Sequence, residues 1–564
     1  MLSSWNTPGL AVAVVRRDNS VPGGWRREYA SYGIAKDDGA PITPDTIFAI
    51  GSNSKLFLSF SVGLLISNET LAKERGKVLD WNTKAQDVLP GWGLMDETAS
   101  KSANIQDMLT HRTGMPGHDN SIAVKPGGKA EMIATLRYLR PSAEFRQTFQ
   151  YNNVMYESLA HLPTVLLNQS YESYVEQHMI KPLNMSSTMY SVKQAEASGK
   201  FADGYQWSMS DTARGIRGIR TATVPYFSRN GTEGLWAGAG GVLSTARDLS
   251  IWVSMLLNNG RHPDTNETVI PEAAVDYAAT GYTVFDRKAS FPELSPKVYG
   301  YGQRIYSYRG HEVFEHGGTT VGFKTQITRF PNDNLAIVVL SNDITANPIV
   351  ESVKWRITDE IFGLSPIDWD SRYRQAYEAS IKNLNTGISR PSDIKPPSAP
   401  FESMEKSYSH PTYGILRPCY ANKGNNSSSS SSSGSYCSDV LSKPLTQTLL
   451  AASGSDAPSL IIPWVRVVAT HLLLTHYTGN IFNASVLWTN RDVREAEGYG
   501  STGDVVTGLD NRFVIEWVKP GQEGEGLAFK GGFWGSEGVD AQEPGGTGEE
   551  SAEAWFKVGD NANN

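Results

Sequence analysis

The spacing of apolar residues predicts both strands and helices over roughly the first 375 positions. Continuous or alternating apolar runs, which are typical of strands, lie at 10–15, 29–34, 323–330 and 335–340. The last two flank Pro331-Asn332-Asp333-Asn334, a turn sequence that predicts an antiparallel hairpin. Longer apolar segments predict helices at 56–66, 155–167, 246–257 and 349–362. This mixture indicates an α/β (α+β) domain in which helices flank an antiparallel sheet.

The pattern changes after about position 375. Residues 383–400 are rich in Pro, Ser and Asn and have no apolar period, so we expect an interdomain linker over 376–404. It would separate a first domain, 1–375, from a second domain, 405–564. The second domain contains short apolar runs, separated by Gly-rich turns. The runs lie at 459–468, 481–487, 513–518, 527–529, 533–534 and 554–556. This spacing is typical of an all-β, barrel-like domain.

Composition limits the classes of function. With 564 residues, 39% of them apolar, the chain is long enough for two domains with large cores. The net charge of −8 and the lack of a basic cluster argue against nucleic acid or an anionic membrane as a partner. No stretch of ~18 uninterrupted apolar residues occurs, so we expect no membrane span. The 10 histidines lack metal-binding spacings, and we expect neither a metal nor a cofactor.

Compartment and redox state stay open at this stage. The first residues lack the basic segment of a signal peptide, so the sequence as it stands predicts a cytoplasmic protein. A truncated form of a longer precursor would instead be secreted. Cys419 and Cys437 fit either a disulfide or two unrelated thiols. The low-complexity stretches 427–433 and 536–553 are expected to be mobile surface loops. The oligomeric state is not determined.

A first motif fits covalent catalysis by serine. Ser52-Asn53-Ser54-Lys55 follows the apolar run 46–51 and opens the apolar segment 56–66. We therefore expect Ser52 in the first turn of a buried helix, with Lys55 one turn further along the same face. A serine hydroxyl needs a positioned base to act as a nucleophile, and Lys55 can reach it. Ser-x-x-Lys also occurs at 392–395 and 403–406, but no apolar helix follows either copy.

Tyr151-Asn152-Asn153 and His316-Gly317-Gly318 supply two further motifs. A tyrosine from a separate segment can share the proton of the serine, and a strand with glycines lets a substrate approach the backbone. Free lysine and tyrosine side chains have pKa values of about 10, so neither is a base at pH 7 without help. We expect Lys55 and Tyr151 to titrate as a coupled pair.

These motifs and several others resemble, in order, the serine β-lactamase-related family of penicillin-recognising serine hydrolases. The resemblance is to the class C-like branch, with its D-aminopeptidases, esterases and transesterases. It spans roughly residues 8–365 and implies a β-lactamase/transpeptidase-like fold. Some relatives carry a lipocalin-like barrel after this domain, and the second domain is compatible with one. The segments that carry the resemblance are 8–15, 108–116, 149–153, 180–185, 238–249, 300–302 and 315–318.

The resemblance implies a role for each motif residue. Ser52 would attack an acyl carbonyl and form an acyl-enzyme, with Lys55 and Tyr151 as its bases. Asn153 would bridge Lys55 and the acyl side chain of the substrate. The oxyanion hole would consist of the backbone N–H groups of Ser52 and Thr319. The oxyanion and substrate-binding set is therefore Ser52, Gly317, Gly318 and Thr319.

Two positions depart from the usual family pattern. His316 stands where true β-lactamases have lysine; histidine can change charge near neutral pH, and it could donate to Tyr151 or to the leaving group. Gly317 stands where the family usually has Thr or Ser to hold a substrate carboxylate. We therefore expect a small-molecule or peptide ester or amide without a free carboxylate beside the scissile bond.

Three functions fit these residues. The first is a serine hydrolase that works through an acyl-enzyme on Ser52. The second is an acyltransferase or transesterase, in which an alcohol or amine replaces water as the acceptor. The third is a catalytically silent binding protein on the same fold. Because Ser52, Lys55, Tyr151 and Asn153 are all present, the sequence favours the hydrolase.

Overall fold

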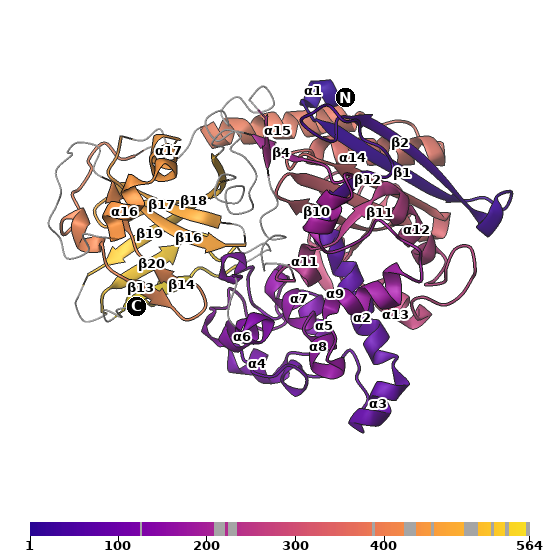
Figure 1. The fold of residues 1–564 in the computed structure, drawn as a ribbon, viewed down its shortest axis with the longest axis horizontal. Helices are drawn as coiled ribbons and strands as arrows, with labels where there is room; N and C mark the ends of the chain where they lie inside the picture. Colours follow the sequence, from indigo (N-terminus) through magenta and orange to yellow (C-terminus); the bar gives the residue numbers. More distant parts are fainter. Residues whose placement is uncertain are drawn as a thin grey trace.

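Two structured parts lie side by side in the molecule. Figure 1 shows a mixed α/β part and, in orange and yellow, a β-rich part formed by the end of the chain. The predicted fold class is confirmed for both parts. The computed structural model describes residues 1–123, 127–207, 220–223, 234–385, 390–421, 436–452, 456–467, 469–489, 506–519, 524–535 and 541–559.

The first part is built on an eight-stranded antiparallel sheet. Its strand order is β2-β1-β12-β11-β10-β9-β8-β7, which places β10, the strand of the His316 motif, inside the sheet. The predicted strands and the β11–β12 hairpin are confirmed. The strands are β1 (Gly9–Arg17), β2 (Trp25–Gly33), β7 (Thr283–Asp286), β8 (Lys297–Tyr299), β9 (Arg304–Tyr308), β10 (His311–Thr320), β11 (Phe323–Phe330) and β12 (Leu335–Ser341).

Most helices of this part lie between β2 and β7 in the chain. The predicted helix over 155–167 is two helices, because α8 starts anew with Pro163 in its first turn, where a missing N–H is tolerated. The helices are α1 (Leu2–Trp5), α2 (Ser54–Ile66), α3 (Glu69–Arg75), α4 (Glu97–Ser102), α5 (Ile105–Leu109), α6 (Gly128–Thr135), α7 (Asn153–Leu159), α8 (Leu162–Leu167), α9 (Tyr171–Val175), α10 (Val192–Ala197), α11 (Ala237–Gly240), α12 (Ala246–Leu257), α13 (Glu272–Ala278), α14 (Asn347–Phe362) and α15 (Trp369–Asn385). Two short strand pairs complete it, β3 (Ile47–Ala49) with β6 (Leu243–Thr245), and β4 (Gly204–Trp207) with β5 (Arg220–Thr223).

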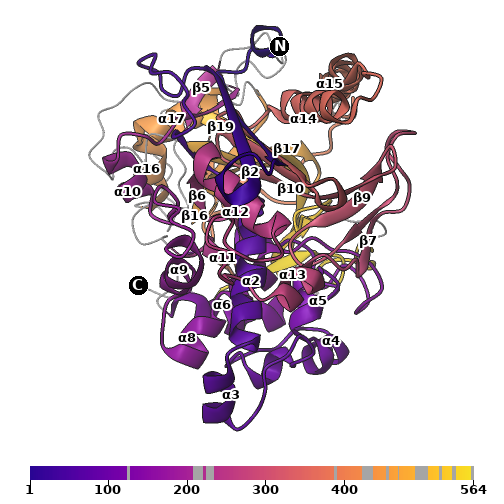
Figure 2. The ribbon, with the colours of Figure 1, turned by 90° about the vertical axis from the view of Figure 1, so that its right-hand side faces the viewer.

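Alternate residues of β1 point to opposite faces of the sheet, and each face has its own helices. Leu10 and Val12 belong to a buried cluster that includes residues of α14 and the start of α15. Ala11 and Ala13 belong to a second cluster that includes α12 and α2. Figure 2 shows α14 and α15 on one side of the sheet and α12 and α2 on the other. Burying one large apolar side chain contributes about 1.5–3 kcal/mol. Burial on both faces therefore makes the sheet a firm support for β10.

The second part is a curled antiparallel sheet of nine strands, with the order β14-β13-β21-β20-β19-β18-β17-β16-β15. This confirms the predicted β-rich, barrel-like domain as a half-barrel. Helices α16 (Tyr436–Ser442) and α17 (Pro444–Ala452), which the sequence did not predict, pack in a cluster beside it. The strands are β13 (Tyr408–His410), β14 (Gly414–Leu416), β15 (Cys419–Ala421), β16 (Ser459–Arg466), β17 (Ala469–Thr478), β18 (Ile481–Thr489), β19 (Val506–Val518), β20 (Gly526–Lys530) and β21 (Ala554–Val558).

Four expectations for this region need correction or completion. Phe533 and Trp534 are buried but lie in a turn, not a strand. The end of the expected loop 536–553 is not mobile surface, because residues 551–553 are buried; residues 427–433 and 536–540 lie outside the described residues. Cys419 and Cys437 form a disulfide that ties β15 to α16. Helix α15 continues through Asn385, so the expected linker begins within a helix, and its bounds stay a prediction.

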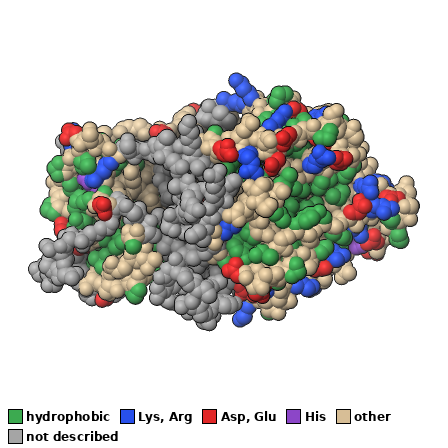
Figure 3. Space-filling view, turned by 90° about the horizontal axis from the view of Figure 1, so that it is seen from above, with side chains coloured by type: hydrophobic (Ala, Val, Ile, Leu, Met, Phe, Trp, Pro, Cys, Tyr) green, Lys and Arg blue, Asp and Glu red, His purple; other side chains and the backbone are tan. Residues whose placement is uncertain are grey.

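The surface gives a mixed picture of charge. On the face that Figure 3 shows, Lys and Arg side chains lie among Asp and Glu side chains. Within the described parts of the chain, no helix has the length and apolar character needed to cross a membrane.

Candidate active site

Ser52 lies in a tight turn between β3 and α2. The turn, Gly51–Asn53, is a 3₁₀ segment in which Gly51 has a φ of +54°, a conformation that glycine adopts without strain. A Cβ atom on Gly51 would lie 2.9 Å from the backbone nitrogen of Thr319, so β10 passes directly beside the serine. The sequence predicted Ser52 in the first turn of a helix. In the structure, Ser52 lies in the 3₁₀ turn that directly precedes α2.

Lys55 is fully buried beneath this turn. Its Nζ donates to Ser52 Oγ at 3.3 Å, to Asn153 Oδ1 at 2.6 Å and to the carbonyl oxygen of Ala239 at 3.0 Å. The ammonium group also lies over the ring of Tyr151, 4.6 Å from its centroid. A buried cation is expensive unless its donors are satisfied, and these acceptors account for all three. The predicted contact between Lys55 and Ser52 is therefore present.

Tyr151 reaches the same serine from another segment. Its hydroxyl donates to Ser52 Oγ at 2.8 Å. The backbone on both sides of Tyr151 is held by His111, whose carbonyl accepts from the Gln150 amide at 2.8 Å and whose Nδ1 accepts from the Asn152 amide at 3.0 Å. Burial holds the pKa of His111 well below its ordinary value, so the ring is neutral and can accept. His111 therefore has a structural role: it holds the backbone on both sides of Tyr151.

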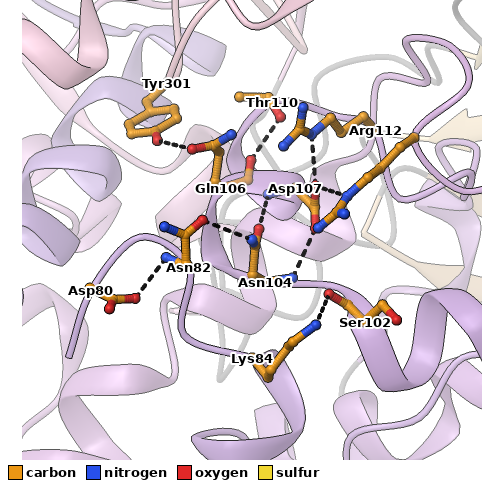
Figure 4. A network of polar contacts seen from close by, with 11 residues as sticks. Asp80, Asn82, Lys84, Ser102, Asn104, Gln106, Asp107, Thr110, Arg112 and Tyr301 are labelled. Carbon is orange, nitrogen blue, oxygen red and sulfur yellow. Dashed lines mark hydrogen bonds and ion pairs between the residues drawn. The ribbon is translucent and has the colours of Figure 1, made fainter. Parts of the chain in front are cut away.

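The segment leading to His111 is anchored by a buried carboxylate. Asp107 accepts from Arg112 Nε at 2.7 Å. Asp107 and Asn104 also exchange two hydrogen bonds in a capping box at the start of α5, at 2.8 and 3.1 Å. Figure 4 shows this network together with neighbouring polar contacts from residues 80–84 and from Tyr301. These bonds fix His111 and, through it, the position of the Tyr151 hydroxyl.

Asn153 connects Lys55 to a carboxylate that the sequence did not identify as a site residue. Its Oδ1 accepts from Lys55, and its Nδ2 donates to both carboxylate oxygens of Asp119 at 3.0 and 3.1 Å. The amide nitrogen that we expected to reach a substrate is thus bonded to Asp119. Asp119 begins a 3₁₀ turn, Asp119–Ser121, in a loop far from the three motifs. Nothing in its local sequence distinguishes it from any other loop aspartate.

His316 lies on β10 and is 5% exposed. Its Nδ1 is 2.6 Å from the carbonyl oxygen of Gly317, which can only accept, so Nδ1 carries the proton. Its Nε2 then accepts from the Tyr299 hydroxyl at 2.9 Å. Burial, and next the positive charges of Arg304 and Lys55, hold the pKa of His316 well below its ordinary value. His316 is therefore neutral at pH 7, and the expected charge switch near neutral pH is not supported.

The two glycines after His316 have different surroundings. A side chain on Gly318 would collide with the carbonyl oxygen of Ile50, so only glycine lets β10 approach the serine turn. Gly317 pairs with Gln326 on β11, and a Cβ atom there would lie 2.9 Å from Gln326 Oε1. Gln326 is 2% exposed, and its Nε2 has no hydrogen-bond partner among the described residues. Its amide thus covers the position where the sequence lacks the usual hydroxyl.

A cavity of about 390 Å³ opens over these groups. Lys55 and Gly318 do not line it. In the described part of the chain, no group of three or more His, Cys, Asp or Glu side chains is placed to hold a metal ion. Six of the predicted site residues line the cavity: Ser52, Tyr151, Asn153, His316, Gly317 and Thr319. Residues that the sequence did not single out as site residues line it too, including Asp119, Trp236, Arg304, Lys324, Gln326 and Glu351.

The fold and this arrangement of serine, lysine and tyrosine define a class, the penicillin-recognising serine hydrolases, whose family-level chemistry is an acyl-enzyme on serine. A sequence model of the family described as Beta-lactamase matches residues 3–360. The chain belongs to this beta-lactamase family.

Two relatives are similar to this chain over most of its length, and one solved structure shares its fold. The unguisins hydrolases ungD' of Aspergillus campestris and ungD of Aspergillus violaceofuscus are 29% and 27% identical to this chain. Each alignment covers 74% of this chain, and they cover 75% and 74% of the two relatives. The octameric penicillin-binding protein homologue from Pyrococcus abyssi shares the fold, with a TM-score of 0.53 at 16% identity, over 93% of this chain and 95% of that chain.

Proposed function

We propose that this protein is a serine hydrolase that cleaves an ester or amide through an acyl-enzyme on Ser52. One observation carries the proposal: the Ser52 hydroxyl faces a cavity while Lys55 Nζ and the Tyr151 hydroxyl both contact its oxygen. A hydroxyl held between two groups that can take its proton is an activated nucleophile.

The chemistry follows from these contacts. The Lys55–Tyr151 pair acts as the base once it has released one of its own protons to solvent; Ser52 Oγ then attacks the acyl carbonyl, and the proton of Ser52 passes to the vacant position of the pair. We assign stabilisation of the negative charge that develops on the carbonyl oxygen to the backbone N–H groups of Ser52 and Thr319; the close passage of β10 beside Gly51 supports this assignment. The pair then protonates the leaving alcohol or amine. Water, activated by the same pair, attacks the acyl-enzyme and releases the acid.

The substrate class follows from position 317. Gly317 offers no hydroxyl for a carboxylate, and the neutral amide of Gln326 covers it. Lys324, a cation at the cavity, is already bonded to Thr319 Oγ1 at 2.8 Å. We therefore propose a small-molecule or peptide ester or amide without a carboxylate next to the scissile bond. Two relatives are named unguisins hydrolases, so unguisins are a natural first substrate to test.

The test compares uncharged p-nitrophenyl esters and blocked peptide amides with nitrocefin, which carries a carboxylate. We expect turnover of uncharged substrates, little turnover of nitrocefin, and no turnover in Ser52→Ala. Hydrolysis that survives in Ser52→Ala would overturn the mechanism, whereas fast nitrocefin turnover would overturn only the substrate class. Product analysis with added alcohols or amines separates hydrolysis from acyl transfer.

A further inference from the structure

The half-barrel domain is hydrogen-bonded to the loop that contains Asp119. The backbone amides of Gly117 and His118 donate to the carbonyl oxygens of Gly535 and Trp534, at 3.1 and 2.8 Å. A Cβ atom on Gly117 would lie 2.7 Å from the Gly535 oxygen, so this approach requires glycine. The turn after β20 is therefore docked directly on the segment that leads to Asp119.

That turn is itself braced by a buried carboxylate. Glu553, which is 3% exposed, accepts from the backbone amide of Gly532 through Oε1 at 2.8 Å and from that of Trp534 through Oε2 at 3.1 Å. The Glu553 amide in turn donates to the Phe529 carbonyl at 2.8 Å. The carbonyl groups that meet the Asp119 loop are thus presented by a fixed turn.

A side-chain bond runs parallel to these backbone bonds. The ring of His118 is 1% exposed; its Nε2 is 2.8 Å from the Arg140 carbonyl oxygen, and its Nδ1 is 2.6 Å from the hydroxyl of Tyr413. Because a carbonyl can only accept, Nε2 carries the proton and Nδ1 accepts from Tyr413. Tyr413 is fully buried and comes from the half-barrel domain, just before β14.

The same domain also touches the Tyr151 side of the site. The backbone amide of Gln542 donates to the Ser142 carbonyl oxygen at 2.8 Å, and Ser142 Oγ donates to Gln150 Oε1 at 3.0 Å. Arg140 Nη1 donates to the carbonyl oxygens of Glu550 and Ala552 at 2.7 and 2.8 Å. The half-barrel domain therefore contacts both segments that flank the serine.

We infer that the half-barrel domain positions the catalytic residues. Tyr413 is the positioning residue: it acts through His118 and Asp119, and these in turn orient Asn153 and Lys55. The half-barrel domain is hydrogen-bonded to both the ring and the backbone of His118. Because Asp119 is the next residue, these bonds fix the position of the Asp119 backbone and so restrict its carboxylate. Asp119 then orients the Asn153 amide, whose oxygen is 2.6 Å from Lys55 Nζ. The inference rests on the proposed function, because it requires Lys55 to serve Ser52.

The test uses two tyrosines of one domain. Tyr413→Phe removes a hydroxyl that donates to His118, whereas the control Tyr408→Phe removes a buried hydroxyl with no hydrogen-bond partner among the described residues. The readout is the second-order rate of Ser52 labelling by a fluorophosphonate, measured from pH 5 to pH 10. We expect Tyr413→Phe to slow labelling about five- to tenfold and to move its pH midpoint, since a lost hydrogen bond leaves a buried acceptor unpaired. Tyr408→Phe should match the wild type.

Each outcome has a clear meaning. Equal labelling rates and equal pH midpoints in the two variants would overturn the inference. If the wild type itself is not labelled at Ser52, the proposed function fails instead. Should Tyr413→Phe not fold, Glu553→Gln replaces it, because one of its two carboxylate acceptors becomes a donor facing a backbone N–H. That variant should show the same direction of change, and a wild-type rate and midpoint in it would overturn the inference.

Discussion

Replacing Asn153 by alanine should slow acylation of Ser52 sharply. Its amide joins Lys55 to Asp119: the oxygen is 2.6 Å from Lys55 Nζ, and the nitrogen is 3.0 and 3.1 Å from the two carboxylate oxygens. Without the amide, the Lys55 ammonium and the Asp119 carboxylate face each other across the gap. We expect Nζ to be drawn toward Asp119 and away from Ser52 Oγ, which it now contacts at 3.3 Å.

The size of the effect follows from the contact that is lost. A hydrogen bond to a charged group is worth about 1.5–3 kcal/mol. Because about 1.4 kcal/mol corresponds to a factor of ten in rate, acylation should slow by roughly ten- to 150-fold. Removing the attracting charge as well, in Asn153→Ala with Asp119→Asn, should restore part of the rate.

The assay is the second-order rate constant for Ser52 labelling by a fluorophosphonate, with the free energy of unfolding measured in parallel. Asn332→Ala, in the exposed turn between β11 and β12, is the matched asparagine control. An Asn153→Ala rate within twofold of the wild type would refute the reasoning. So would a double variant that is slower than Asn153→Ala, because the Asp119 charge would then help acylation.

Three further predictions concern stability. Lys354→Met should destabilise the fold by about 3–5 kcal/mol in urea denaturation, because it strands the buried Glu315 carboxylate 2.9 Å away, and adding Glu315→Gln should recover most of the loss. Burial lowers the pKa of His118 to about 4, below the value of about 6.5 in the unfolded chain, so protonation favours unfolding. The neutral ring therefore contributes about 3 kcal/mol to the free energy of unfolding above pH 6.5, and this contribution is lost as the pH falls toward 4. Urea denaturation of His118→Gln should lack this part of the pH dependence. Reducing the Cys419–Cys437 bond should lower the free energy of unfolding by about 2–4 kcal/mol, and no change on reduction would contradict that value.

The sequence predicted what local spacing determines. Ser52 and Lys55 are three residues apart where the 3₁₀ turn Gly51–Asn53 continues into α2, so their contact follows from the local helical path of the chain. The β11–β12 hairpin likewise follows from two apolar runs and a short turn between them. These features need no knowledge of the remaining chain.

What the sequence could not predict depends on long-range packing. Asp119 and Gln326 enter the site because distant segments meet there, and their local sequences resemble ordinary loop and strand. The same holds for Tyr413, which is 295 residues from its partner His118. The sequence predicted that His316 changes charge near neutral pH. Its burial and its hydrogen bond to Tyr299 keep it neutral, and both depend on the tertiary structure.

The most direct test of the account is peptide mass spectrometry after incubation with a fluorophosphonate. We predict one covalent adduct, located on the peptide that contains Ser52, and no adduct in a folded Ser52→Ala variant. An unmodified wild-type protein, or an adduct that persists in Ser52→Ala, would contradict the claim that Ser52 is the nucleophile.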